Sequence, residues 1–348
     1  MCAKLDAIFI PEKIREKKSA RAGLGGRMNF GSTFEEKRTR KGLELRIGIN
    51  HISKNITNFF LITSLVLVLA GLYGCQTLIM DKKDVGGFNG EKAFRDVEYQ
   101  LSLGPRIPGT IGHELILNWM ESELEAVNWR VERQELEIKG KTVINLIASR
   151  GEGDYILLGA HYDTRIYADH DEDPTMRHEP VPGANDGASG VAVLLELGRI
   201  LPADLPIAIK LVFFDAEDNG GIDDWDWILG SRAFVRELNE KPSAAIIVDM
   251  IGDADLEVYY EHNSDITLME QIWQQARKLG YEDIFIPEFR HSMLDDHTPF
   301  IEAGIPAVDM IDFNYPYWHT TSDTLDKVSP ESLKAVGDTR TAWLLENE

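Results

Sequence analysis

The sequence predicts an α/β protein with three layers, in which helices cover both faces of a mixed, mostly parallel central sheet. One reason is that short apolar strands alternate with amphipathic helices from residue 131 onward. Another is the run DYILLGAHYDT, residues 154–164, whose apolar stretch is typical of a strand buried on both faces. In such sheets the ligand site lies beyond the carboxyl ends of the strands, so we expect the functional residues there.

Periodicity predicts the elements in the first part of this region. Residues 90–104 have helical spacing, and apolar residues recur in steps of three and four between Leu115 and Val127, which indicates a second helix. The pattern then changes to the alternation of strands in 131–138 and 142–150.

Helices and strands alternate in the remainder of the chain. Ser329 and Pro330 are typical of the start of the last helix. We predict helices over 187–201, 231–238, 265–280 and 329–346, and strands over 207–218, 244–253, 256–261 and 306–312.

The N-terminal part of the chain has a different character. Residues 1–53 have no apolar periodicity, and we interpret them as disordered or as an over-long gene prediction. Residues 54–75 have an apolar core of about 16 residues, which is short for a membrane span of roughly 20. They read as a secretory signal peptide, and the ending LYGC resembles the lipobox of bacterial lipoproteins, in which Cys75 is lipidated. An uncleaved membrane anchor is the alternative.

These features divide the chain into a signal peptide, a tether over 76–90 and a catalytic domain over 91–348. Residues 1–54 carry 13 Lys and Arg against 6 Asp and Glu, whereas the rest carries 23 against 52. Such an acidic body repels phosphates, so we expect no nucleic-acid partner. The only two cysteines, Cys2 and Cys75, cannot form a disulfide framework.

Acidic and histidine side chains gather at the predicted strand ends. In FFDAEDNGG, residues 213–221, three carboxylates follow an apolar run, and like charges so close together are unfavourable unless a cation or a proton-transfer role compensates them. Imidazole and carboxylate together suit Zn²⁺. The residues that the predicted topology brings to this edge are His161, Asp163, Asp186, Glu217, Asp218, Asp249 and His319.

Seven motifs in a fixed order carry a resemblance to a known family. They are GAHYDT, PGANDGASGVAVLLEL, FFDAED, LGSRAF, IIVDMIG, LDDHTPF and YWHTTSDTLDKVS. In order and spacing the chain resembles the animal-type glutaminyl-peptide cyclotransferases over roughly residues 91–348. That family belongs to the same superfamily as the family-28 zinc aminopeptidases. The resemblance therefore implies the zinc aminopeptidase or phosphorylase/hydrolase-like fold. Similar lipoprotein or periplasmic forms occur in bacteria.

The resemblance implies a zinc ion held by Asp186, Asp218 and His319. It implies that Glu217 is the catalytic acid and base. The family commonly has two glutamates at the positions of Glu217 and Asp218, so the metal ligand here is one methylene shorter. Aspartate remains a competent zinc ligand, but the strand end must then approach the metal more closely.

Three other site residues follow from the same resemblance. Asp249 and Asp295 would be hydrogen-bonded acids that support Glu217, and Trp318 would line the substrate pocket. Trp225 and Trp227 cannot both occupy the position of the family's other pocket tryptophan, and the sequence does not decide between them.

Two enzymatic functions and one non-enzymatic function compete. In a cyclotransferase, zinc polarises the side-chain amide of an N-terminal glutamine while Glu217 moves a proton. In an aminopeptidase, His161 and Asp249 would add ligands for a second zinc, and Glu217 would activate a bridging water. The combination of LDDHTPF with YWH favours the cyclotransferase. A non-catalytic, lipid-anchored binding protein is the remaining alternative, but it predicts erosion of the site, and none is visible.

The expected partners follow from the preferred reading. We expect peptide or protein N-termini as substrates, a lipid anchor in the membrane and a monomeric protein. The signal peptide places the domain at the bacterial cell envelope, on the periplasmic or surface side.

Overall fold

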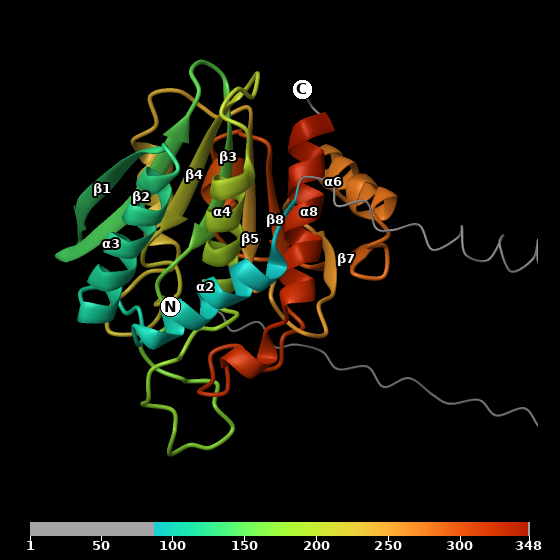
Figure 1. Ribbon diagram of the computed structural model, residues 1–348. Coiled ribbons are helices and arrows are strands. Elements are labelled where there is room, and N and C mark those ends of the chain that lie inside the picture. The colour runs from blue at the N-terminus through green and yellow to red at the C-terminus, as the bar shows by residue number, and fades with distance from the viewer. Residues whose placement is uncertain (1–86, 347–348) are drawn as a thin grey trace, which may run out of the picture. The chain divides into compact units, whose positions relative to one another are not determined.

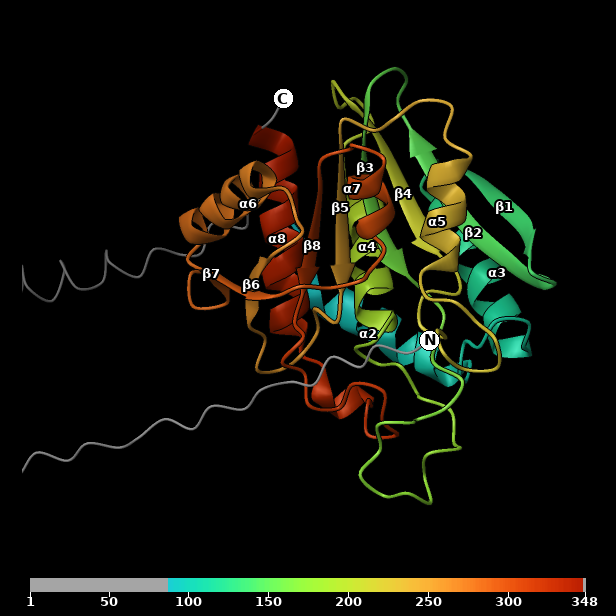
Figure 2. The same ribbon diagram turned by 180° about the vertical axis from the view of Figure 1, so that it is seen from behind.

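The computed structural model describes residues 87–346 of the chain. A six-stranded sheet lies at its centre, with helices on both sides (Figures 1 and 2). The strand order is β1-β2-β4-β3-β5-β8. Their bounds are β1 Arg130–Ile138, β2 Lys141–Arg150, β3 Tyr155–His161, β4 Ala208–Phe214, β5 Ala244–Asp249 and β8 Ala307–Ile311.

The sheet is mixed, as predicted. β1 and β2 form an antiparallel hairpin at one edge, and β2 also pairs antiparallel with β4. The pairs β4–β3, β3–β5 and β5–β8 are parallel, so the carboxyl ends of these four strands lie at one edge. A smaller parallel pair, β6 Val258–Glu261 with β7 Phe285–His291, lies outside this sheet.

One face of the sheet carries most of the helices (Figure 1). The large hydrophobic core lies beneath them, and residues such as Val191 on α4 and Ile116 on α3 are fully buried there. The helices on this face are α2 Gly90–Ser102, α3 Ile111–Ala126, α4 Ala188–Ile200, α6 Ile266–Lys278 and α8 Pro330–Glu346. A short 3-10 helix, η1 Leu325–Lys327, precedes α8.

The opposite face is covered by two shorter helices, α5 Leu229–Arg236 and α7 Thr298–Glu302 (Figure 2). Phe234 of α5 and Phe300 of α7 contact Phe214 at the end of β4, with ring centroids 5.8 and 6.2 Å apart. This second core is smaller than the first, and both cores need apolar side chains from the same strands.

β3 illustrates why the central strands have continuous apolar runs. Ile156 and Leu158 belong to the large core, and Tyr155 and Leu157 belong to the small one. Successive side chains of a strand point to opposite faces, so a strand covered on both sides has no polar face. The prediction that residues 154–164 contain a strand buried on both faces is therefore confirmed. The strand itself spans Tyr155–His161.

Several predicted boundaries were wrong. The strand predicted over 207–218 ends at Phe214, because Ala216 has a positive φ of 53°, which an extended strand does not allow. β7 and α7 were not predicted, since β7 is mostly exposed and contains a proline, and α7 has only five residues.

The first two helices differ in detail from the prediction. α3 begins at Ile111, where the Thr110 side chain accepts a hydrogen bond from the His113 main-chain N–H, and Leu115 is 43% exposed rather than on the buried face. Phe88, in the predicted tether, is buried in the core of the domain.

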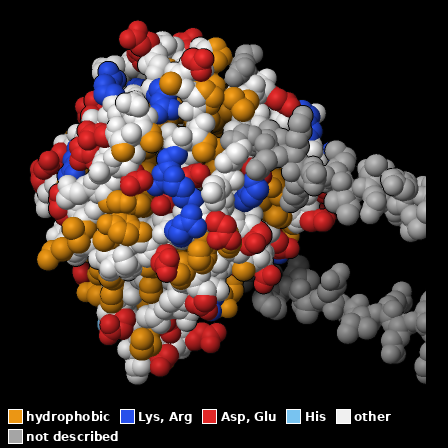
Figure 3. All heavy atoms as spheres, viewed as in Figure 1, with side chains coloured by type: hydrophobic (Ala, Val, Ile, Leu, Met, Phe, Trp, Pro, Cys, Tyr) orange, Lys and Arg blue, Asp and Glu red, His pale blue; other side chains and the backbone are white. Residues whose placement is uncertain are grey.

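The face of the molecule in Figure 3 carries scattered acidic side chains, and Lys and Arg gather there in small groups only. Among the helices that the structure describes, none combines the length and apolar character required to cross a membrane. The predicted signal peptide and Cys75 lie outside the described residues.

Candidate metal centre and active site

The predicted site residues meet at the carboxyl edge of the parallel strands. His161 is the last residue of β3, and Asp249 is the last residue of β5. Glu217 and Asp218 follow β4 in a loop, and Asp186 lies two residues before α4. His319 reaches the same place from the loop after β8.

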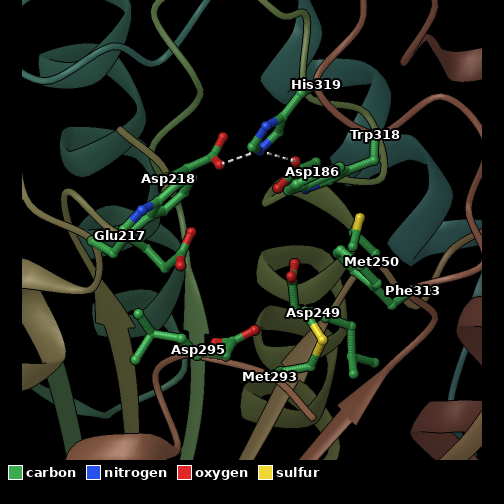
Figure 4. Close-up of a pocket in the computed structure, with 13 residues that line it drawn as sticks. Asp186, Glu217, Asp218, Asp249, Met250, Met293, Asp295, Phe313, Trp318 and His319 are labelled. Atoms are coloured by element: carbon green, nitrogen blue, oxygen red, sulfur yellow. Dashed lines mark hydrogen bonds and ion pairs between the residues drawn. The ribbon is translucent and has the colours of Figure 1, made fainter. Parts of the chain in front are cut away.

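A cavity of about 210 Å³ opens at this edge (Figure 4). Acidic side chains and His319 line one part of it, and aromatic and methionine side chains line another. Its residues are Asp186, Glu217, Asp218, Trp227, Asp249, Met250, Met293, Leu294, Asp295, Ile311, Phe313, Trp318 and His319.

Asp186, Asp218 and His319 form a buried group in which one ligand atom of each lies within 4.8 Å of the others. His319 Nε2 is 2.6 Å from Asp218 Oδ1 and 3.8 Å from Asp186 Oδ2. Burial lowers the pKa of His319 to about 3, so its imidazole is neutral, the form that binds a metal.

This group also has unsatisfied polar atoms. Asp186 Oδ2, Asp218 Oδ2 and His319 Nδ1 are buried without a hydrogen-bond partner among the described residues. Burying unpaired polar atoms is costly, and a cation between the two carboxylates removes that cost. The group offers one imidazole nitrogen and two carboxylates as ligands, and the adjoining cavity leaves room for a substrate. Three protein ligands with an open fourth position are typical of a catalytic zinc ion.

A second buried group shares Asp186 with the first. His161 Nε2 lies 3.1 Å from Asp186 Oδ1 and 3.1 Å from Asp249 Oδ1. Burial opposes protonation of His161, but Asp249 and the other carboxylates outweigh it and raise its pKa well above the usual value. The structure therefore brings together every residue that a second metal would need, with Asp186 placed between the two groups.

Strained backbone brings these side chains to their positions. Ala216, Met250 and His319 have φ values of 53, 47 and 57°, in the left-handed region that side chains other than glycine rarely occupy. Each of them lies at or next to a site residue. Such strain is common at functional sites and persists only where the surroundings hold it.

Asp163 provides part of that support. Its buried carboxylate accepts hydrogen bonds from the main-chain N–H groups of Glu217 and Asp218, at 3.0 and 3.3 Å, and from Asn219 Nδ2 at 3.0 Å. Charge-assisted bonds of this kind are stronger than neutral ones. Asp163 therefore fixes the loop that carries Glu217 and Asp218.

Glu217, Asp249 and Asp295 point their carboxyl groups into the same cavity from three segments of the chain (Figure 4). Burial raises the pKa of all three, that of Asp249 to about 7 and that of Glu217 well above its ordinary value. Repulsion from Asp295 adds to the shift of both Glu217 and Asp249. The three groups thus form an acid cluster in which burial disfavours ionisation.

Of the two tryptophans between which the sequence did not decide, Trp227 faces the cavity and Trp225 does not. Trp227 lines the cavity, and its ring is nearly parallel to that of His319, at 6.0 Å and 7°. Trp225 lies elsewhere, under the ammonium group of Lys141. The Trp227 ring packs directly against the backbone of residue 220. Only glycine allows this contact, because a Cβ at that position would lie 2.1 Å from the ring.

Trp318 lines the same cavity and stacks on His319 with ring centroids 3.7 Å apart.

Asp215, the first acid of FFDAEDNGG, turns away from the site. Its carboxylate accepts a hydrogen bond from the Ile144 main-chain N–H and lies 2.8 Å from His113 Nε2. Only two of the three crowded acids therefore belong to the site.

Sequence reasoning missed the apolar half of the cavity. Met250, Met293, Leu294, Ile311 and Phe313 line it, but apolar residues in loops look the same in a sequence whether they face a cavity or a core. The one available signal was their position, since each lies within two residues of a predicted site residue or of a strand end.

Solved structures of known proteins resemble this one closely. The glutaminyl cyclase of Porphyromonas gingivalis is 35% identical, with a TM-score of 0.72 over 75% of this chain and 99% of that one. A Zn-dependent exopeptidase from Parabacteroides distasonis is 32% identical, with a TM-score of 0.71 over 74% and 98%. Fold and site together thus define a protein of the zinc-exopeptidase fold.

The chain belongs to peptidase family M28, whose sequence model matches residues 142–344. Among characterised relatives, aminopeptidase YwaD of Bacillus subtilis is 27% identical over 290 residues. That match covers 74% of this chain but only 57% of the relative.

Proposed function

We propose that the protein is a glutaminyl-peptide cyclotransferase, which converts the N-terminal glutamine of a peptide into pyroglutamate and releases ammonia. The observation that carries this proposal is the position of Asp295, a third buried carboxyl group in the cavity that holds Glu217 and Asp249. Burial raises the pKa of Asp249 to about 7, repulsion from Asp186 and Asp295 adds to the shift, and a raised pKa disfavours the ionised form that a second metal requires. The similarity to a bacterial glutaminyl cyclase over nearly its whole length supports the same function.

The side chains of the site have defined roles in this reaction. Zinc, when held by Asp186, Asp218 and His319, supplies a Lewis acid for the side-chain amide of the substrate. Glu217 takes a proton from the α-amine as that nitrogen bonds to the amide carbon, and gives it to the amide nitrogen, which leaves as ammonia. Burial, with added repulsion from Asp295, raises the pKa of Glu217 above its ordinary value, which helps it to hold the proton between these two transfers.

The apolar part of the cavity has a complementary role. Trp227, Phe313 and Trp318 cover the reacting groups and limit the access of water. Exclusion of water favours attack by the substrate's own amine over hydrolysis. A cavity of about 210 Å³ has room for one glutamine side chain but not for a folded segment.

A di-zinc aminopeptidase is the second candidate, and one observation favours it. His161, Asp186 and Asp249 form a complete second ligand group next to the first. With two metals, Glu217 would activate a water molecule and the product would be a free amino acid.

Zinc titration of the metal-free protein tests the proposal. We expect ammonia release from a Gln-peptide to reach its maximum at one zinc per chain. A maximum at two zinc ions per chain, accompanied by release of free amino acids from Leu- and Ala-peptides, would instead establish the aminopeptidase.

We also propose that the domain is anchored to the bacterial cell envelope by a lipid on Cys75 and faces the periplasm or the cell surface. The short apolar segment that ends in LYGC supports this location. A monomer is sufficient for the reaction, because one chain supplies all of the site residues named above.

A further inference from the structure

Asp169 lies on the outer side of the metal-binding histidine. His319 directs Nε2 toward Asp218 and Asp186, and its Nδ1 faces Asp169 Oδ1 at 3.8 Å. Nδ1 is buried and has no hydrogen-bond partner among the described residues. A histidine that binds a metal through one ring nitrogen ordinarily donates the proton of the other to a carboxylate, a carbonyl oxygen or water.

Arg165 holds the Asp169 carboxylate in place. Its Nε donates to Asp169 Oδ1 and its Nη2 donates to Oδ2, both at 2.7 Å. The side chain of Arg165 is only 4% exposed, whereas that of Asp169 is 38% exposed. A partly exposed carboxylate is thus fixed by two charge-assisted bonds to a buried guanidinium group.

The same arginine joins Asp169 to the rest of the metal centre. Arg165 Nη1 donates to the main-chain carbonyl of Asp218 at 2.6 Å, and its guanidinium carbon lies 4.9 Å from the ring centre of Trp227. Arg165 therefore links the Asp169 carboxylate to the loop that carries the metal ligand Asp218, and so fixes the distance between them.

The 3.8 Å between His319 Nδ1 and Asp169 Oδ1 is longer than a hydrogen bond, so the two side chains must approach each other by roughly 0.7 Å for that bond to form. Asp163 and Arg165 both bond to the main chain of Asp218, on the other side of the histidine ring.

We propose that Asp169, clamped by Arg165, is a positioning residue that accepts the Nδ1 proton of His319 and so fixes the tautomer whose Nε2 binds the metal. This inference rests on the proposed metal site of Asp186, Asp218 and His319. It assigns a role to the loop between β3 and α4, which the sequence motifs did not reveal.

The test compares Asp169→Asn with Glu172→Gln. The first substitution replaces the carboxylate by an amide, whose NH₂ group would lie against either Arg165 or His319, so the new side chain cannot accept from both donors. Glu172 is exposed in the same loop, and its replacement removes the same charge without a contact to His319, so it controls for long-range electrostatics.

Zinc affinity is the first measurement, made by competition with a chelator on the full chain. We expect Asp169→Asn to weaken zinc binding by about 10–100-fold and Glu172→Gln to stay within about twofold of the unaltered protein. Equal affinities in the two variants would overturn the inference. Failure of the unaltered protein to bind zinc would instead overturn the proposed metal site itself.

Nitrogen NMR of the His319 ring in the zinc-loaded protein is the second measurement. We expect the metal on Nε2 and an Nδ1 proton that exchanges slowly with water, in the unaltered protein and in Glu172→Gln. In Asp169→Asn that proton should exchange rapidly, although the fold is retained. An Nδ1 proton equally protected in all three proteins, or a metal bound through Nδ1, would contradict the assignment.

Discussion

Replacing Glu217 by glutamine separates proton transfer from metal binding. The Glu217 carboxylate makes no hydrogen bond to another described residue. Its main chain is held by two bonds that the substitution keeps: the Glu217 N–H donates to Asp163 Oδ1 at 3.0 Å, and the Glu217 carbonyl accepts from the Ile228 N–H at 3.0 Å. Glutamine has the same size and shape. We therefore expect the variant to fold, with a change in unfolding free energy of roughly 1 kcal/mol, and to retain its zinc.

The effect on the rate should be far larger. General acid–base catalysis contributes about 10²–10⁴-fold, so kcat should fall by at least ~100-fold, equivalent to about 2.7 kcal/mol of activation free energy. KM should change little, because the lost interaction forms mainly in the transition state.

Steady-state ammonia release and metal analysis on the same preparation measure both effects. The matched variant is Asp218→Asn, which should weaken zinc binding and regain part of its activity when zinc is added. A Glu217→Gln enzyme that cyclises Gln-peptides at nearly the normal rate would refute the acid–base role. Zinc loss in Glu217→Gln, with intact zinc in an inactive Asp218→Asn, would exchange the two assignments.

Three further predictions concern the metal, stability and location. His319→Ala should lose stoichiometric zinc, which metal analysis of the folded variant would detect, because two protein ligands do not hold Zn²⁺ stably. Burial opposes ionisation of Glu261, but the His297 ring, whose Nε2 lies 3.3 Å from Glu261 Oε2, and hydrogen bonds from main-chain N–H groups lower its pKa to about 2. Its stabilisation is therefore complete above the unfolded pKa of 4.5 and lost as the pH falls toward 2. Glu261→Gln should cost up to about 3 kcal/mol of unfolding free energy at pH 7, and this cost should vanish near pH 2; a cost independent of pH would refute it. Palmitate labelling of the full-length chain should disappear in Cys75→Ser, and surviving label would exclude Cys75 as the lipidated residue.

The part of the site that could be predicted lies on regular structure. His161 and Asp249 end buried strands, and topology alone places such residues at one edge of a parallel sheet. Asp186 precedes a helix that packs on this sheet, so its position also follows from the order of the elements. Local pattern and topology agree for these residues, which is why their proximity was predictable.

The rest depends on loop geometry, which a sequence pattern does not encode. Trp227 faces the cavity and Trp225 does not, because of the turn around Gly220 and its close contact with the Trp227 ring. Asp215 and Glu217 are two residues apart, yet the positive φ of Ala216 sends them to different environments. Asp169 lies in a long loop without periodicity, and its distance to His319 became apparent only in three dimensions.

The most direct test of the proposed function is mass spectrometry of a peptide with N-terminal glutamine after incubation with the zinc-loaded protein. We predict that the peptide loses one molecule of ammonia, becomes resistant to N-terminal sequencing and keeps all its residues, while a matched peptide with N-terminal leucine is unchanged. Release of free glutamine or leucine, with a peptide shortened by one residue, would contradict cyclisation and show that this site is an aminopeptidase.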